Sequence, residues 1–176
     1  MRKDLLSLGF VILLVAILFS GTKIQSVNEY YLTHIDEINE DSETITISIR
    51  ADTVLDNMDK LKPELKKYVP KDGVILEETE YVLRPGDTVF DILHRTVRHN
   101  RIQMEYQGAN MNVYNSVYIQ GINYLYEFSC GPLSGWMYAV NGVFPNYGVS
   151  KYELNDGDKI ELKYTCDLGR DLGNEF

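Results

Sequence analysis

The sequence has little cysteine and little positive charge. Its two cysteines, Cys130 and Cys166, are too few for a disulfide scaffold, and they lack the paired spacing of a zinc site. Lys and Arg number 17 against 26 Asp and Glu, which gives a net charge of −9. Because nucleic acid and anionic lipid bind clustered Lys and Arg, this balance argues against either as the main partner.

Catalytic and metal-binding signatures are also missing. The chain has no phosphate-binding glycine loop and no Ser-His-Asp pattern in a recognisable context. His94 and His99 are five residues apart and do not share one helical face, which argues against a metal pair. Asp156, Asp158, Asp167 and Asp171 could assemble a calcium site, but Asp-Gly-Asp before a strand is more typical of a turn. We therefore expect no enzyme activity, no cofactor and no metal.

Only the N-terminus carries a long hydrophobic run. Arg2 and Lys3 precede a mostly apolar, uncharged stretch at residues 5–19, which is typical of an export signal. As a helix this stretch rises ~22 Å, against a hydrocarbon core of ~30 Å. Residues 1–22 are therefore predicted to be either a signal peptide or a short membrane anchor. Both alternatives predict an extracytoplasmic protein at the bacterial cell surface, membrane-anchored or secreted.

After this run, the pattern predicts a tether and one folded domain. Residues 23–43 are rich in acidic residues and show no sustained helical or strand period, which predicts an acidic tether. TITISI at residues 44–49 alternates polar and apolar residues, so a strand is expected to begin the domain. A second strand is expected at 74–83, after the PKDG turn at 70–73.

One main helix is predicted between strands. Thr88 and Asp91 form a variant of the capping box after the Pro85-Gly86 turn. The apolar face of this helix should lie on a sheet and consists of Val89, Phe90, Leu93 and Val97. Further strands are expected at 102–106, 116–121 and 123–128. This order predicts an α+β fold, β-grasp-like, with a mixed or antiparallel sheet and one main helix, preceded by the N-terminal hydrophobic helix.

Aromatic residues gather in one stretch, SGWMYAVNGVFPNYG, at residues 134–148. Asn141-Gly142 is a strong signal for a β-hairpin, because a type I′ turn needs positive φ at both positions. Asp156-Gly157 is expected to turn the chain into a last strand, whose inner side carries Ile160, Leu162 and Tyr164.

The aromatic residues of this stretch have two interpretations. In a half-buried sheet Trp136 and Tyr138 can simply be core residues. However, nine of the thirteen tyrosines lie between residues 106 and 164, more than one small core can bury with every hydroxyl bonded. Some of them must therefore present an amphipathic surface, and such surfaces bind rings, sugars or proteins.

Several motifs at the C-terminal end carry a family resemblance: Gly135-Trp136-Met137-Tyr138, Asn141-Gly142, Gly148-Val149-Ser150, Tyr152, and residues 154–160 with Asp156-Gly157-Asp158. They resemble the C-terminal domain of transcobalamin and intrinsic factor, and still more the bacterial exported family that shares it, the transcobalamin-like or DUF4430 family. The similarity spans residues 44–173 and is most specific at 130–169. It implies a β-grasp of the soluble-ligand-binding type. In the vitamin carriers, the segment matching Trp136-Met137-Tyr138 lies against the corrin ring of cobalamin.

The chain departs from the vitamin carriers in one respect. Those proteins clamp cobalamin between this domain and a large helical barrel, for which 176 residues leave no room. A lone domain offers one face, whereas tight sites bury most of the ligand surface. The resemblance nevertheless implies a ligand site, and with the following loop we expect it to comprise Trp136, Met137, Tyr138, Tyr147 and Tyr152.

Three functions remain open at this point. The first is an extracytoplasmic, membrane-associated module that binds a soluble ligand, corrinoid-like or another cyclic small molecule, together with a surface or transporter protein. The second is a cell-surface module that recognises glycan or protein through a tyrosine-rich face. The third is a purely structural domain. Cobalamin is a possible ligand only in the first, and contact with the membrane is expected only through the N-terminal segment.

Cys130 and Cys166 are predicted to form a disulfide. Export would place both thiols where a bridge can persist. Cys130 precedes the strand that begins near Trp136, and Cys166 ends the last strand. If these strands are antiparallel neighbours, the start of one lies beside the end of the other. The alternative is a pair of free, buried thiols.

Overall fold

The computed structural model describes residues 9–10, 12–13, 26 and 36–174. The chain divides into two units, Met1–Tyr30 and Tyr31–Phe176. Most of the predicted signal peptide or anchor at 1–22 and most of the tether at 23–43 therefore lie outside the described residues. Within the described part, no helical segment combines the length and apolar character needed to cross a membrane.

A four-stranded mixed sheet forms the centre of the domain, in the order β2-β1-β7-β6. Its strands are β1 (Thr44–Arg50), β2 (Val74–Val82), β6 (Gly135–Val140) and β7 (Lys159–Thr165). β1 pairs antiparallel with β2 and parallel with β7, and β6 pairs antiparallel with β7. β2 and β6 are therefore the two edges of this sheet.

Alternation of side chains along the strands builds the core. Ile45, Ile47 and Ile49 of β1 are each at most 1% exposed. The parallel register sets Ile47 beside Ile160 and Ile49 beside Leu162 of β7, so the apolar residues of both strands share one face. The predictions of a strand at 44–49 and of an apolar inner side on the last strand are confirmed.

The main helix, α4 (Val89–His99), covers that face. Thr88 and Asp91 form the predicted capping box: the Thr88 N–H donates to the Asp91 carboxylate (2.9 Å), and the Asp91 N–H donates to the Thr88 hydroxyl (3.4 Å). The buried face differs from the prediction at three residues. Ile92 and Thr96 are also buried, whereas Phe90 is half-buried and stacks on His94, with ring centroids 5.3 Å apart.

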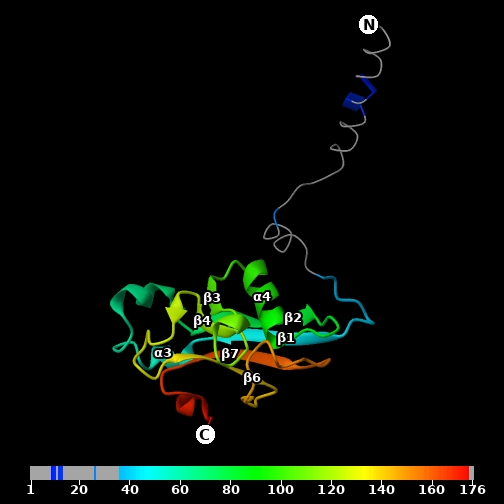
Figure 1. Ribbon diagram of the computed structural model, residues 1–176. Helices are drawn as coiled ribbons and strands as arrows, with labels where there is room; N and C mark the ends of the chain where they lie inside the picture. The colour runs from blue at the N-terminus through cyan, green and yellow to red at the C-terminus, as the bar shows by residue number, and fades with distance from the viewer. Residues whose placement is uncertain (1–8, 11, 14–25, 27–35, 175–176) are drawn as a thin grey trace. The chain divides into compact units, whose positions relative to one another are not determined.

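A smaller antiparallel sheet lies on the same side as α4 (Figure 1). It contains β3 (Met104–Gln107), β4 (Tyr118–Ile122) and β5 (Leu125–Tyr126), with β4 in the middle. Asn123 and Tyr124 both have positive φ, 51° and 63°, and form the turn between β4 and β5. The expected strand at 123–128 is therefore shorter than predicted, because its first two residues are the turn.

Short helical segments complete the domain: α3 (Asp52–Leu55), η1 (Pro63–Tyr68), η2 (Ala109–Met111) and η3 (Arg170–Leu172). A second buried cluster lies beside α3 and consists of Ala51, Val54, Leu61, Leu125, Cys130, Tyr164 and Cys166. With two sheets and one main helix, the predicted α+β class is confirmed.

The predicted hairpin at 134–148 forms only in part. Asn141 and Gly142 have φ of 53° and 78°, as a type I′ turn requires, and Val140 and Val143 exchange two backbone hydrogen bonds of 2.9 and 3.0 Å. The second arm then stops, and β6 pairs with β7 instead. In a continued hairpin, residue 145 would donate its N–H to the Tyr138 carbonyl, but Pro145 has no N–H.

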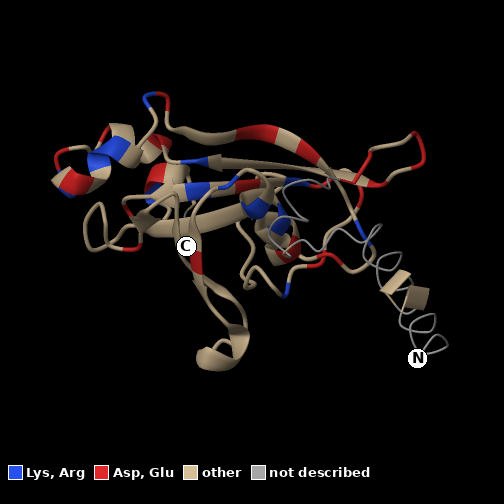
Figure 2. Cartoon of the chain, turned by 90° about the horizontal axis from the view of Figure 1, so that it is seen from above, with Lys and Arg blue, Asp and Glu red and all other residues tan. Residues whose placement is uncertain are grey.

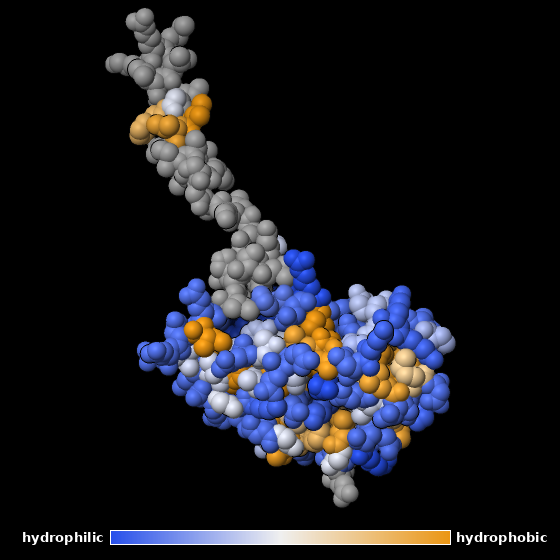
Figure 3. Space-filling model, turned by 180° about the vertical axis from the view of Figure 1, so that it is seen from behind, coloured by the Kyte–Doolittle hydropathy of each residue, from blue (hydrophilic) through white to orange (hydrophobic). Residues whose placement is uncertain are grey.

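The described surface is mainly hydrophilic. Lys and Arg are dispersed among Asp and Glu in the view of Figure 2, and apolar residues form separate small patches in the view of Figure 3. Several of the larger exposed side chains are aromatic, among them Tyr114, Phe128 and Tyr147. Exposed apolar patches of this kind are candidates for binding surfaces.

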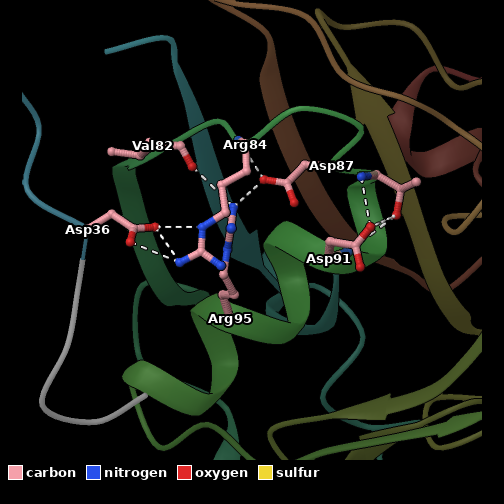
Figure 4. A network of polar contacts seen from close by, with 7 residues as sticks. Asp36, Val82, Arg84, Asp87, Asp91 and Arg95 are labelled. Carbon is pink, nitrogen blue, oxygen red and sulfur yellow. Dashed lines mark hydrogen bonds and ion pairs between the residues drawn. The ribbon is translucent and has the colours of Figure 1, made fainter. Parts of the chain in front are cut away.

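The end of the predicted tether that the structure describes is bound to the domain (Figure 4). The guanidinium of Arg84 donates to both carboxylate oxygens of Asp36, at 2.9 and 3.0 Å. Asp87 links this pair to α4, because it accepts from the Arg84 N–H (2.8 Å) and from the half-buried Arg95. The exposed Asp36–Arg84 pair contributes little stability by itself, but it fixes where the chain enters the domain.

Candidate functional site

Two adjoining hollows lie along β6, and together we call them the β6 groove. The smaller has a volume of about 140 Å³ and the larger about 320 Å³. Both include Tyr118, Trp136 and Met137 in their walls. The smaller continues over Val117, Ile119, Tyr138, Gly148, Val149 and Leu162. The larger continues over Glu127, Phe128, Pro132, Leu133, Ser134, Gly135, Thr165 and Leu168.

Trp136 is held firmly although part of it reaches the groove. Its indole N–H donates to the Leu125 carbonyl (2.7 Å), and its ring meets the edge of Tyr164 with centroids 5.3 Å apart. The side chain packs against both buried clusters. The single tryptophan is thus both a core residue and a wall of the groove, which combines the two interpretations drawn from the sequence.

Tyr138 and Met137 reach the groove from β6 in different ways. Tyr138 is 9% exposed, and its hydroxyl donates to the Tyr147 carbonyl (2.6 Å). That hydroxyl is therefore already used within the domain. Met137 lies on the opposite face of the strand, where its sulfur packs on Gly169: a Cβ at that glycine would lie 2.8 Å from the sulfur.

The other two predicted ligand contacts stand apart from the hollows. Tyr147 is 67% exposed, and Tyr152 packs on the core with its ring edge toward Tyr138. Neither lines the β6 groove. The structure therefore brings Trp136, Met137 and Tyr138 together at one surface, with Tyr152 behind them and Tyr147 outside.

Sequence reasoning missed the opposite wall of the groove. Tyr118 of β4 donates its hydroxyl to the Glu127 carboxylate (2.6 Å). Burial, followed by this hydrogen bond, raises the pKa of Tyr118 to about 12. Phe128, Leu133 and Leu168 add exposed apolar surface around the larger hollow. No local motif marks these residues. They reach β6 from three separate segments: β4, the loop after β5 and the loop after β7.

Cys130 and Cys166 are free, buried thiols in this structure. The pairing on which the disulfide prediction depends is present: β6 and β7 are antiparallel neighbours, with Gly135 opposite Thr165. Burial, followed by a hydrogen bond to Cys130, raises the pKa of Cys166 to about 12. The thiols thus lie side by side, and the disulfide stays a prediction.

Asp156 and Asp158, two of the four aspartates considered for calcium, have other partners. Asp156 accepts from the Thr44 N–H (2.7 Å), and Asp158 accepts from the Asn141 side chain (2.7 Å). Across the described residues, no cluster of three or more His, Cys, Asp or Glu side chains is arranged to hold a metal ion. These carboxylates order the turn between Leu154 and β7.

Three tyrosine hydroxyls are expected to make the domain sensitive to alkaline pH. Burial raises the pKa values of Tyr118, Tyr138 and Tyr164 to about 12, whereas a tyrosine in an unfolded chain titrates near 10. The folded state holds these protons more tightly, so their stabilising contribution is complete below about pH 10 and is lost as the pH rises through about 12.

We expect urea titrations to show a fall of at least about 2 kcal/mol in the free energy of unfolding across this range, mainly from the buried Tyr138 and Tyr164, since the more exposed Tyr118 contributes less. Tyr138→Phe should reduce the fall, since it removes one of the three groups. Identical pH profiles for the wild type and this variant would contradict the assignment.

Comparison with known proteins agrees with the resemblance seen in the sequence. Residues 86–166 match the family model described as "Domain of unknown function (DUF4430)", a shorter match than the expected 44–173. None of the curated proteins matches the chain. A solved structure from Ruminococcus gnavus, described as a "putative metal binding protein", is similar over 70% of this chain and 96% of that one, with 12% identity and a TM-score of 0.40. The segment that contains α4, β6 and β7 therefore matches the DUF4430 family.

Proposed function

We propose that this protein is an extracytoplasmic, non-catalytic module that binds a soluble ligand with an apolar ring, corrinoid-like or another cyclic small molecule. The observation that carries the proposal is the β6 groove. The indole of Trp136, the phenol of Tyr118 and the side chain of Met137 belong to the lining of both of its hollows. Glu127 supplies one polar group at the rim. A mostly apolar wall with few polar groups is the usual composition of small-molecule sites.

The dimensions of the groove favour binding together with a partner. Pockets that enclose a drug-sized ligand have volumes of roughly 300–1,000 Å³. The larger hollow, at about 320 Å³, reaches only the lower end of this range. A corrin-sized ring would therefore rest one face on the groove and leave the other exposed. A surface or transporter protein that covers the exposed face would complete such a site.

Binding is tested by equilibrium dialysis of the full chain against cobalamin and against a panel of uncharged aromatic compounds. Phe128→Ala removes an exposed ring from the groove, and we expect at least about fivefold weaker binding of any compound that binds there. Tyr147→Ala is the matched control, because it removes an exposed ring outside the groove. Failure of cobalamin alone would exclude the corrinoid version, and failure of the whole panel would exclude a small-molecule site.

The proposed location rests on Arg2, Lys3 and the apolar run that follows them. We expect most of the full chain, expressed in a bacterial host, to sediment with membranes and to be cleaved by protease added to intact cells. A signal peptide would instead release a mature protein that begins near residue 21. Protease resistance in intact cells, with cleavage only after lysis, would refute the extracytoplasmic location.

A second candidate function is recognition of glycan or protein by exposed tyrosines. Tyr68 and Tyr124 stack with ring centroids 4.3 Å apart, and the Lys67 ammonium lies 4.8 Å from the Tyr68 centroid. Stacked rings beside a cation form a platform on which a sugar ring can pack. Binding to a glycan array that Tyr68→Ala abolishes and Phe128→Ala leaves intact would favour this candidate over the groove.

A further inference from the structure

One side of β6 has no hydrogen-bonded strand, although β4 approaches β6 to within 8 Å between Cα atoms. β6 is the last strand of the larger sheet, and β7 occupies its other side. The Asn141 N–H donates to the Lys159 carbonyl (2.9 Å), which fixes which residues of β6 bond to β7. Since bonding alternates along an antiparallel pair, Trp136, Tyr138 and Val140 direct their backbone groups away from β7. The backbone groups of Val140 bond to Val143. The backbone groups of Trp136 and Tyr138 point to the side of β6 where these two residues line the smaller hollow.

The walls of the groove confirm that it follows this edge. A hollow over one face of a strand would be lined by alternate residues. Consecutive residues of β6 line both hollows instead: 136–138 in the smaller and 135–137 in the larger. The backbone of β6 is therefore part of the wall, and the apolar hollows flank the path that an added strand would follow.

The two edges of the sheet differ in chemistry. β2, at the opposite edge, carries Glu77, Glu78 and Glu80, and its pairing with β1 contains register shifts. Charges and irregularities of this kind protect an edge against pairing with other chains. β6 has the sequence GWMYAV, without a charged residue, and pairs regularly. Only β6 therefore has the composition of an edge that accepts a strand.

The charge at the groove narrows the class of partner. Glu127 is the one charged residue among those that line the two hollows. Its carboxylate accepts a hydrogen bond from the neutral Tyr118 hydroxyl. A positively charged side chain would complement this carboxylate at the rim. The chain as a whole, with a net charge of −9, also favours a basic partner.

We propose that the free edge of β6 accepts an extended, basic peptide segment of a partner protein as a fifth strand. The backbone groups of Trp136 and Tyr138 would pair with the added strand, its apolar side chains would enter the two hollows, and a Lys or Arg would meet Glu127. In strand addition, backbone bonds give the affinity and side-chain pockets give the specificity. This inference deepens the proposed function by giving the partner protein its place, and its tests use no small molecule, so the two proposals can fail separately.

The first test measures amide hydrogen exchange in the full chain without partner. Amides of Met137 and Ala139 bond to β7, whereas those of Trp136 and Tyr138 do not. We expect the second pair to exchange at least about 100-fold faster than the first. Equal protection of all four amides would show that the edge is already occupied, and it would overturn the proposal.

The second test selects partners from a phage-displayed library of random nine-residue peptides, with the full chain as bait. Enriched peptides should contain Lys or Arg, shift the fluorescence of the single Trp136, and slow the exchange of the Trp136 and Tyr138 amides. Glu127→Gln should weaken their binding by about fivefold, the size expected for a partly exposed ion pair. Failure to enrich any peptide, or binding that protects other amides only, would overturn the proposal.

The third test uses each selected peptide as its own control. Two versions are synthesised, one N-methylated at the even positions and the other at the odd positions. An added strand directs alternate N–H groups at β6, so one version should bind at least about 30-fold more weakly and the other within about threefold of the parent. Equal losses in both versions would show that the peptide does not bind as a strand.

Discussion

Trp136→Ala is expected to lower the free energy of unfolding by about 3–4 kcal/mol and to abolish binding at the β6 groove. The indole packs against both buried clusters and meets the Tyr164 ring. Its removal leaves a cavity between the clusters and leaves the Leu125 carbonyl without its donor at 2.7 Å. Urea titration followed by circular dichroism measures the stability, because the variant has no tryptophan fluorescence.

Trp136→Phe separates packing from hydrogen bonding. Phenylalanine keeps most of the ring contact with Tyr164 but lacks the N–H, so we expect a smaller loss of about 1–2 kcal/mol. Binding at the groove should weaken but persist, since an aromatic wall remains. If Trp136→Ala unfolds at the same urea concentration as the wild type, the indole does not join the two clusters. Its assignment to the core would then be wrong.

Local sequence patterns correctly predicted strands and helices that bury one apolar face. The alternation of Ile45, Ile47 and Ile49 can be satisfied only by a strand with one buried face, and the strand is there. The capping box of Thr88 and Asp91 likewise predicts where α4 begins, and it needs only the four residues 88–91. Both features depend on neighbours in the sequence, so the sequence contains the necessary information.

Features that depend on distant residues were predicted less well. Asn141-Gly142 correctly predicted the turn, but whether the second arm forms depends on Pro145 and on competition from β7 for the same strand. The wall of Tyr118 and Glu127 depends on how the smaller sheet packs beside β6, a tertiary contact that no local pattern encodes. The motif around Trp136 located one wall of the candidate site, and only the folded chain reveals the other.

Oxidation of Cys130 and Cys166 to a disulfide is expected to stabilise the domain by about 3–4 kcal/mol. In the chain-entropy model the bridge closes the loop that contains β6 and β7, and it restricts the unfolded chain. Both thiols already lie in one buried cluster, and a bridge would replace the contacts of the Cys130 thiol with the Asn57 carbonyl (3.4 Å) and of the Cys166 thiol with the Thr53 hydroxyl (3.8 Å). The raised pKa of Cys166 makes its thiolate scarce, so oxidation should be slow without a thiol oxidase.

Mass spectrometry after alkylation without reductant measures the bridge in protein recovered from the cell surface. The double variant Cys130→Ala with Cys166→Ala is the matched control: reductant should lower the stability of the wild type and leave that of the variant unchanged. Two alkylated cysteines in the exported wild type would contradict the prediction. The thiols would then be small buried residues beside Tyr164, and the anchorage of β6 would rest on packing and on its pairing with β7.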